Sequence, residues 1–513
     1  MAWLHLMRSR LLRLIRSRSD GRRSPHPRML RLYGPRYVAR ASPSCRISCV
    51  GRRRARPSSR CRTARRHTAL STPTKTLTSN FSTLPISLPP LHLTQTSCRW
   101  RSRTAMKRLR LPLCFILALV FFASPRLQAQ GKEFFLYSGT YTGFKFVRHN
   151  LPQLAGQPKS KGIYVMRFNA GTGEIGEPQL AAEIANPSFI TISPNHKFLY
   201  AVSEDPTSVG PPLDHASYVS AYAIEPATGK LRLLNTKPTG GTSTCFLSMD
   251  QTGRYVMMAN FGSGSVTILN IHPDGSIGGM TAFMQHIGHS VDPLIQAMPH
   301  PHSILPSPDN RHVIVSDLGQ DKVFVYDFDD KTGALSPPEP HFATVAPGGG
   351  PRHFTFGRNG KFGYQLGEMS GALNVFAWDP AGVLTPVQAI STVTPGLVTD
   401  NHSAEIEVGR DGRFLYESNR RVGSDGSRGP DTIGVFAIDP VKGTLTQVQE
   451  QQTIIMPRSF AIDPTGSFLL AASELHNTIV SYKIDQSTGK LAPTGKQISM
   501  DTPVCLKFVP VQP

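Results

Sequence analysis

The sequence predicts an all-β fold, a seven-bladed β-propeller whose ring is closed by pairing of the C-terminal strand with the N-terminal blade. Three observations lead to this prediction. A unit of apolar and aromatic-rich runs separated by turns recurs along most of the chain, and its complete copies begin at spacings of 50 to 57 residues. One further copy is split between the two ends of the repeat region. Four strands in a repeat of roughly 40–60 residues are typical of a propeller.

The repeating unit is clearest between Pro351 and Pro386. It consists of an apolar run, the turn Arg358-Asn359-Gly360, an aromatic-rich run, a polar break and a third apolar run that ends in a Gly followed by an aliphatic residue. Tight turns between such runs indicate antiparallel hairpins, so each unit should form four strands. The six complete units begin at Pro187, Thr244, Pro301, Pro351, Ser403 and Pro457.

The ends of the repeat region make up a seventh unit. Residues 134–142 match only the second strand of a unit, and residues 162–175 supply its last two strands. The missing first strand is at the other end of the chain, where residues 503–508 match Pro187–Ile192. We therefore expect the C-terminal strand to complete the first blade and to close the ring.

The formal charge of +22 belongs to the N-terminal part of the chain. Residues 1–105 hold 24 Lys and Arg against one acid, Asp20, and residues 106–129 add four basic residues, so residues 130–513 carry a net charge of −5. The basic balance therefore says nothing about the partners of the repeat region, and we expect no nucleic-acid partner. Residues 1–105 are interpreted as a disordered extension or as sequence upstream of the true start, with a basic nucleic-acid or membrane arm as the alternative.

Residues 106–129 have the three parts of a secretory signal peptide. Lys107, Arg108 and Arg110 form a charged region, residues 111–123 an apolar one, and residues 127–129 a cleavage site. The apolar run is too short to span a bilayer comfortably. We expect Met106 to be the initiator and the mature domain, residues 130–513, to be exported to the periplasm or the extracellular space without a stable membrane anchor.

Only two of the seven cysteines, Cys245 and Cys505, lie in the mature chain. They fall in the first strands of blades three and one, which are not adjacent. A disulfide is not expected at that separation, so both should be buried thiols.

Four stretches of the repeat region together resemble a known family. They read PHSILPSPDNRHVIVSDLGQDKVFVYDFD, GGGPRHFTFGRNGKFGY, NHSAEIEVGRDGRFLYESNR and RSFAIDPTGSFLLAAS. They are similar to the seven-bladed lactonases, which include bacterial 6-phosphogluconolactonase and the fungal carboxy-muconate lactonising enzyme. The resemblance covers residues 131–513 and implies an enzyme, expected to be a monomer, that acts on a small-molecule lactone.

The repeat register also predicts a site. The second residue of each unit and the residue 16 positions later are opposite each other across a hairpin, so both lie at one end of the blade. If the first strand is innermost, this end opens on the central channel. Arg suits a lactone carbonyl, a carboxylate or a phosphate, and His suits proton transfer near neutral pH. Blades four to six place His302, Arg352, Glu368 and Arg420 at these positions.

The resemblance implies a catalytic role for these four residues, because the catalytic His, Arg, Glu and Arg of the lactonising branch match their positions. The alternative is a ring of salt bridges between blades. On the catalytic interpretation, the chain hydrolyses a sugar-derived lactone without metal or cofactor. His302 or Glu368 activates water, and Arg352 and Arg420 stabilise the oxyanion. The choice between His302 and Glu368 as the base is left open. Two other functions also stay open, a cycloisomerase and an exported scaffold propeller without catalytic activity, since fold alone does not decide function.

Several neighbouring residues carry weaker expectations. His353 and Glu405 are third residues of their units, so they should point away from the second residues. A structural pairing is expected for them, with support of the site from behind as the alternative. Arg458 and Glu474 repeat the positions of Arg352 and Glu368 in blade seven, and they are expected to form an ion pair.

Four long insertions should leave the ring at the same mouth, where a substrate lid would be expected. The insertion of residues 286–300 carries His286, His289 and His300, and zinc can use such spacing. No Cys, Asp or Glu ligand stands fixed beside these histidines, so no metal is expected. The other insertions are residues 144–161, 205–218 and 421–431.

Overall fold

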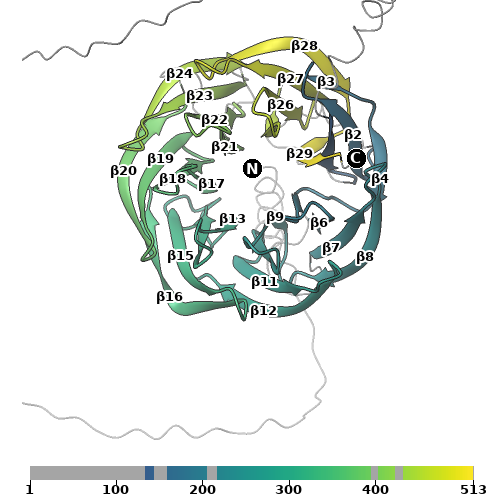
Figure 1. Cartoon of the computed structure of the whole chain (residues 1–513). Coiled ribbons are helices and arrows are strands. Elements are labelled where there is room, and N and C mark those ends of the chain that lie inside the picture. The colour runs from purple at the N-terminus through teal and green to yellow at the C-terminus, as the bar shows by residue number, and fades with distance from the viewer. Residues whose placement is uncertain (1–132, 144–158, 205–216, 394–401, 422–430, 512–513) are drawn as a thin grey trace, which may run out of the picture. The chain divides into compact units, whose positions relative to one another are not determined.

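The computed structural model describes residues 133–143, 159–204, 217–393, 402–421 and 431–511, apart from the side chains of residues 337–339. In these residues, seven antiparallel sheets surround a central channel (Figure 1). All of the regular elements that the structure describes are strands, so the predicted all-β, seven-bladed propeller is confirmed. The predicted extension and signal peptide, residues 1–105 and 106–129, lie outside the described residues.

The first strand of a blade lies innermost and the fourth forms the outer wall (Figure 1). Blades two to four are β5 (Ile190–Ile192), β6 (Phe198–Ser203), β7 (Tyr218–Ile224), β8 (Leu231–Pro238); β9 (Thr244–Met249), β10 (Tyr255–Asn260), β11 (Ser265–Ile271), β12 (Ile277–Gln285); and β13 (Pro301–Pro306), β14 (His312–Asp317), β15 (Lys322–Asp329), β16 (Ala334–Thr344). Blades five to seven are β17 (Pro351–Phe356), β18 (Phe362–Gly367), β19 (Ala372–Asp379), β20 (Val383–Ser391); β21 (Ile406–Val408), β22 (Phe414–Asn419), β23 (Thr432–Ile438), β24 (Leu445–Gln452); and β25 (Pro457–Ile462), β26 (Phe468–Ser473), β27 (Thr478–Ile484), β28 (Leu491–Ser499).

Blade one is assembled from both ends of the described chain. The strand β29 (Pro503–Pro510) pairs antiparallel with β1 (Glu133–Thr140), from Phe134 opposite Pro510 to Gly139 opposite Cys505. The remaining strands are β2 (Gly162–Asn169), β3 (Glu174–Ile175) and β4 (Gln179–Glu183), and both β3 and β4 pair with β2. The predicted closure of the ring is therefore confirmed.

Neighbouring blades are joined by an aromatic side chain and a glycine. Gly489, in the turn between the third and fourth strands of blade seven, has a φ of 72°, and a Cβ added there would lie 2.4 Å from the ring of Phe414 in blade six. Only glycine fits this conformation and this contact. The Tyr416 hydroxyl donates to the Gly489 carbonyl at 2.8 Å. Tyr137 with Gly229 and Tyr200 with Gly275 repeat this bond, so the recurrent Gly of the unit serves contact between blades.

The hydrophobic core lies between the blades. Leu366 and Val375 of blade five, for example, pack with Ile406 and Val408 of blade six. Cys245 and Cys505 are buried and free, as expected for two structural thiols.

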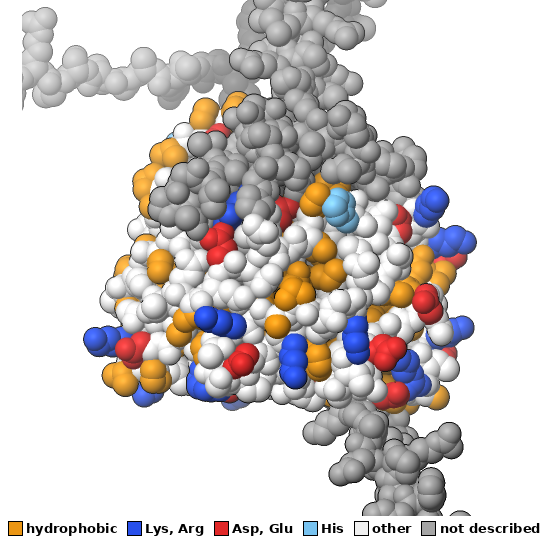
Figure 2. Space-filling view, turned by 90° about the horizontal axis from the view of Figure 1, so that it is seen from above, with side chains coloured by type: hydrophobic (Ala, Val, Ile, Leu, Met, Phe, Trp, Pro, Cys, Tyr) orange, Lys and Arg blue, Asp and Glu red, His pale blue; other side chains and the backbone are white. Residues whose placement is uncertain are grey.

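The face in Figure 2 carries charges of both signs. Basic and acidic side chains are interspersed along one rim, and hydrophobic side chains are scattered over the rest of the visible surface. This mixture agrees with the small net charge of the repeat region. Within the described ranges, no helix has the length and apolar character needed to cross a bilayer.

Candidate active site

A β-bulge at the start of the inner strands directs the candidate residues into the channel. Pro351 pairs with Gly367 and His353 with Leu366, so Arg352 is an extra residue in the ladder. The same register shift occurs in blades four and seven, at His302 and Arg458. A bulge interrupts the alternation of side chains and re-aims the extra residue.

The bulge overturns the expectation that His353 points away from Arg352. The Nη1 group of Arg352 donates to Nε2 of His353 at 2.9 Å, and the rings of His302 and His353 are 5.4 Å apart. That expectation was wrong because alternation along a strand holds only where the ladder is regular. The expected pairing of His353 with Glu405 is confirmed, since Nδ1 and Oε1 are 2.9 Å apart.

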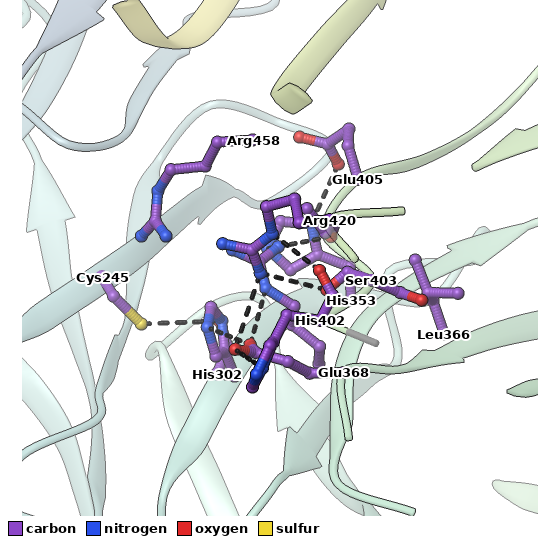
Figure 3. A network of polar contacts seen from close by, with 12 residues as sticks. Cys245, His302, His353, Leu366, Glu368, His402, Ser403, Glu405, Arg420 and Arg458 are labelled. Carbon is purple, nitrogen blue, oxygen red and sulfur yellow. Dashed lines mark hydrogen bonds and ion pairs between the residues drawn. The ribbon is translucent and has the colours of Figure 1, made fainter. Parts of the chain in front are cut away.

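The four predicted residues meet around the carboxylate of Glu368. Figure 3 labels three of them, His302, Glu368 and Arg420. Its Oε2 accepts a hydrogen bond from Nε of Arg352 at 2.9 Å and lies 3.5 Å from Nε2 of His302. Its Oε1 lies 3.5 Å from Nη2 of Arg420. All four side chains are buried. The cluster spans blades four, five and six, and a buried carboxylate needs such cationic partners to remain ionised.

Arg352 keeps hydrogen-bonding capacity beyond its protein contacts. Its Nε serves Glu368, and its Nη1 serves His353 and the carbonyl of Ala404. In the part of the chain that the structure describes, no acceptor bonds to Nη2 of Arg352. A guanidinium group held in place on one side, with a donor left on the other, suits a developing oxyanion.

Arg420 is held more completely by the protein. Its Nε donates to the carbonyl of His402 at 2.7 Å, and its Nη2 donates to the carbonyl of Ser403 at 3.2 Å. The same Nη2 lies 3.5 Å from Glu368. Arg420 therefore fixes the position of the carboxylate relative to the loop that precedes β21.

His302 is neutral in this environment. Burial, and secondarily the positive charge of Arg352, hold its pKa well below the ordinary histidine value. The Cys245 thiol donates to the His302 carbonyl, with sulfur and oxygen 3.7 Å apart, and its sulfur also lies 3.7 Å from Nδ1. With the thiol hydrogen directed at the carbonyl, the sulfur can accept from Nδ1–H. In that tautomer, Nε2 presents a lone pair beside Glu368.

His353 extends the polar contacts away from the cluster. Its Nε2 accepts from Arg352, so Nδ1 carries the hydrogen that is donated to Glu405. Burial and then Arg352 lower the pKa of His353 well below its ordinary value. Burial raises the pKa of Glu405, and Lys507 and Arg352 oppose that shift. This neutral histidine links Arg352 to Glu405 and keeps the guanidinium group in place.

Sequence reasoning missed His402, whose Nδ1 lies 3.8 Å from Oε1 of Glu368. It precedes the first residue of its unit and so lies outside the two register positions that predicted the site. A signal was present, because only blades four and six of the repeats place a histidine there, at His300 and His402. In the other five blades this residue has a positive φ, as in Asn186, Ser243, Gly350, Met456 and Thr502.

The prediction of an ion pair between Arg458 and Glu474 was wrong, because the described structure contains no ion pair between these two side chains. Instead, Nη2 of Arg458 donates to the Tyr141 hydroxyl at 3.0 Å, and this hydroxyl donates to Oε2 of Glu204 at 3.1 Å. Tyr141 follows Thr140 in blade one as Glu474 follows Ser473 in blade seven. The register positions that predicted the site come from the six complete units, and Tyr141 lies in the split blade, so it was missed as a partner.

The histidines of residues 286–300 have structural partners. Nδ1 of His286 lies 2.6 Å from Oδ2 of Asp317, and Nε2 lies 2.9 Å from the hydroxyl of Tyr326. His300 bonds the carbonyl of Phe261 through Nδ1 at 2.7 Å and stacks on its ring. Among the described residues, no three His, Cys, Asp or Glu side chains are grouped to hold a metal ion. The other three insertions fall largely outside the described residues.

Comparison with known proteins agrees with this architecture. The family described as "Lactonase, 7-bladed beta-propeller" matches residues 135–508. The 6-phosphogluconolactonase of Bacillus subtilis is 32% identical over 352 residues, which cover 68% of this chain and 95% of that protein. The 6-phosphogluconolactonase of Formosa agariphila is 32% identical over 336 residues, which cover 64% of this chain and 90% of that protein.

A solved structure extends the comparison to three dimensions. The periplasmic gluconolactonase of Pseudomonas aeruginosa is 29% identical and superimposes with a TM-score of 0.65, covering 74% of this chain and 100% of that one. The matched residues include all seven blades and the closing strand. The chain therefore belongs to the seven-bladed β-propeller lactonase family and is a lactonase-type hydrolase.

Proposed function

We propose that this protein hydrolyses a sugar-derived lactone at the His302, Arg352 and Glu368 cluster, by general-base catalysis without a metal ion. The observation that carries the proposal is the meeting of a neutral imidazole, a carboxylate and a guanidinium group with an unused donor at the channel end of blades four and five. These groups can supply a proton acceptor, a counter-charge and an oxyanion donor.

In the proposed reaction, a water molecule attacks the carbonyl carbon of the lactone while Nε2 of His302 takes a proton from the water. The carbonyl π electrons move onto oxygen, and Nη2 of Arg352 donates to the resulting oxyanion. The carboxylate of Glu368 stabilises the imidazolium, because it lies 3.5 Å from Nε2. Collapse breaks the bond between the carbonyl carbon and the ring oxygen, His302 returns the proton to that oxygen, and an open-chain hydroxy acid leaves. Arg420 acts as a positioning residue for Glu368.

A panel of lactones tests this function directly. Ring opening by the purified protein would be followed through proton release in weakly buffered solution, with aldono-1,5-lactones, aldono-1,4-lactones and a carboxylated muconolactone as substrates. We expect aldonolactones to be hydrolysed with kcat/KM of at least about 10⁴ M⁻¹ s⁻¹. Interconversion of the muconolactone and its diene without proton release from the sugar lactones would favour a cycloisomerase. No turnover of any substrate would favour a scaffold.

We also propose that the working protein is exported and begins near Gln130. The charged, apolar and small-residue regions of residues 106–129 support this proposal. Intact-mass measurement of the protein from its native host is expected to give a chain lacking residues 1–129. A stable species that retains residues 1–105 would contradict the proposal.

A further inference from the structure

A second polar cluster is built from the same register positions in blades seven, one and two. Arg458 is the second residue of its unit, as Arg352 is in blade five. Tyr141, Glu204 and Glu474 each follow the second strand of their blade, as Glu368 does in blade five. The repeat therefore places this cluster at the same end of the channel as the candidate active site. Burial is the largest cause that lowers the pKa of His302 and of Arg352, and the positive charge of Arg458 lowers both further. The two clusters therefore interact electrostatically.

The second cluster is held together by a short chain of contacts. Nη2 of Arg458 donates to the Tyr141 hydroxyl, and its guanidinium carbon lies 5.5 Å from the centre of the Tyr141 ring. The Tyr141 hydroxyl donates in turn to Glu204. Figure 3 shows the Arg458 guanidinium group on the side of the active-site cluster where Cys245 and His302 lie. The arginine is thus fixed by the protein at one nitrogen.

Part of the hydrogen-bonding capacity of this cluster is unused within the described structure. No described residue bonds to Nε or Nη1 of Arg458, or to the carboxylate of Glu474. Glu474 is only 3% exposed. Neither Glu474 nor Arg458 is among the described residues with a fully buried polar atom that lacks a partner, so these polar atoms are open to the channel. They are therefore available to hydrogen-bond with a ligand or with water.

The charges indicate which kind of ligand fits. The two clusters together contain three arginines and three glutamates, and His302 is neutral, so the six charges cancel. A phosphate dianion would meet one guanidinium group flanked by two glutamates in the second cluster, whereas phosphate sites usually gather several cationic or amide donors. Hydroxyl groups both donate and accept, so they match the carboxylates and the guanidinium group. The six residues are Arg352, Arg420, Arg458, Glu204, Glu368 and Glu474.

Building on the proposed lactonase function, we propose that Tyr141, Glu204, Arg458 and Glu474 form a subsite for the hydroxyl groups of an unphosphorylated sugar lactone and disfavour its phosphorylated form. The carboxylates accept hydrogen bonds from the sugar hydroxyls, and Arg458 donates to a hydroxyl oxygen. The carbonyl carbon of the lactone is then held over His302 and Arg352.

The test compares two substrates that differ by one phosphate. We expect kcat/KM for glucono-1,5-lactone to exceed that for its 6-phosphate by tenfold or more. The double substitution Glu204→Gln and Glu474→Gln should reduce this ratio at least tenfold, mainly through KM. Glu407→Gln is the matched control, because Glu407 is a glutamate paired with Arg410 outside both clusters and should leave the ratio unchanged. Preference of the wild-type protein for the phosphorylated lactone, or a ratio unaffected by the double substitution, would overturn the subsite.

A binding measurement separates this inference from the proposed function. Calorimetric titration with D-glucitol and with its 6-phosphate needs no turnover, and glucitol is expected to bind more tightly to the wild-type protein. If neither lactone is hydrolysed, the proposed function fails, yet the titration still decides the subsite. If both lactones are hydrolysed and the phosphorylated polyol binds more tightly, the function stands and the subsite is wrong.

Discussion

Replacing Arg352 with alanine is expected to lower lactone turnover by about a hundredfold or more, equivalent to about 2.7 kcal/mol of transition-state stabilisation. The variant loses the Nη2 donor assigned to the oxyanion and the guanidinium group that holds Glu368 and His353. The fold should persist because Glu368 remains within 3.5 Å of Arg420. Turnover of the best lactone and the thermal melting temperature, measured on the same preparation, check this prediction.

Arg358→Ala is the matched control for Arg352→Ala. Arg358 also belongs to blade five and also donates to carbonyls of blade six, at Val408 and Gly409. It makes these contacts away from the Glu368 cluster. We expect Arg358→Ala to lower the melting temperature while turnover stays near that of the wild type. Equal losses of activity in the two variants, in step with their losses of stability, would show that the charged cluster only ties the blades together.

His302→Ala and Glu368→Gln should show losses similar to that of Arg352→Ala, and the pH profile separates their roles. The base must be unprotonated, and burial with Arg352 holds the pKa of His302 well below its ordinary value. Activity should therefore fall only as the pH drops below about 6.5, the value of an unperturbed histidine. His302→Ala should abolish this acidic limb in the residual activity. An unchanged limb in that variant would assign the titration to another group.

Deleting residues 503–513 is expected to prevent folding or to cause aggregation. The deletion removes β29, whose side chains Cys505, Leu506 and Val509 are buried, and leaves β1 without its partner on the channel side. An unpaired strand edge recruits other chains. Size-exclusion chromatography and thermal melting of the truncated and full-length proteins check the prediction, and the full-length protein is expected to elute as a monomer.

Two milder changes make the closure test more specific. A chain that ends at Val511 keeps all of β29 and should melt like the full-length protein. Leu506→Ala removes only buried hydrocarbon and should cost about 2–5 kcal/mol of stability while leaving the protein monomeric. A monomeric truncated protein with an unchanged melting temperature would show that β29 is not needed for the closed ring.

The blade count, the ring closure and the meeting of His302, Arg352, Glu368 and Arg420 could all be predicted from the sequence. The reason is that they depend on local chemistry. Turn residues and alternating apolar runs define each hairpin, and a repeat carries the same position to the same place in each blade. A residue identified by its register is therefore placed before any tertiary contact is known.

Only the tertiary structure decided the features that depend on the β-bulge and on contact between blades. The bulge at Arg352 turns His353 toward the cluster, and strand alternation alone predicted the opposite direction. Arg458 bonds to Tyr141 instead of Glu474 because closure of the ring brings the split blade beside blade seven. Residues 141 and 458 are 317 positions apart in the sequence. Local patterns carry no information on which of several polar side chains meet across such a distance, because the packed ring selects the partner.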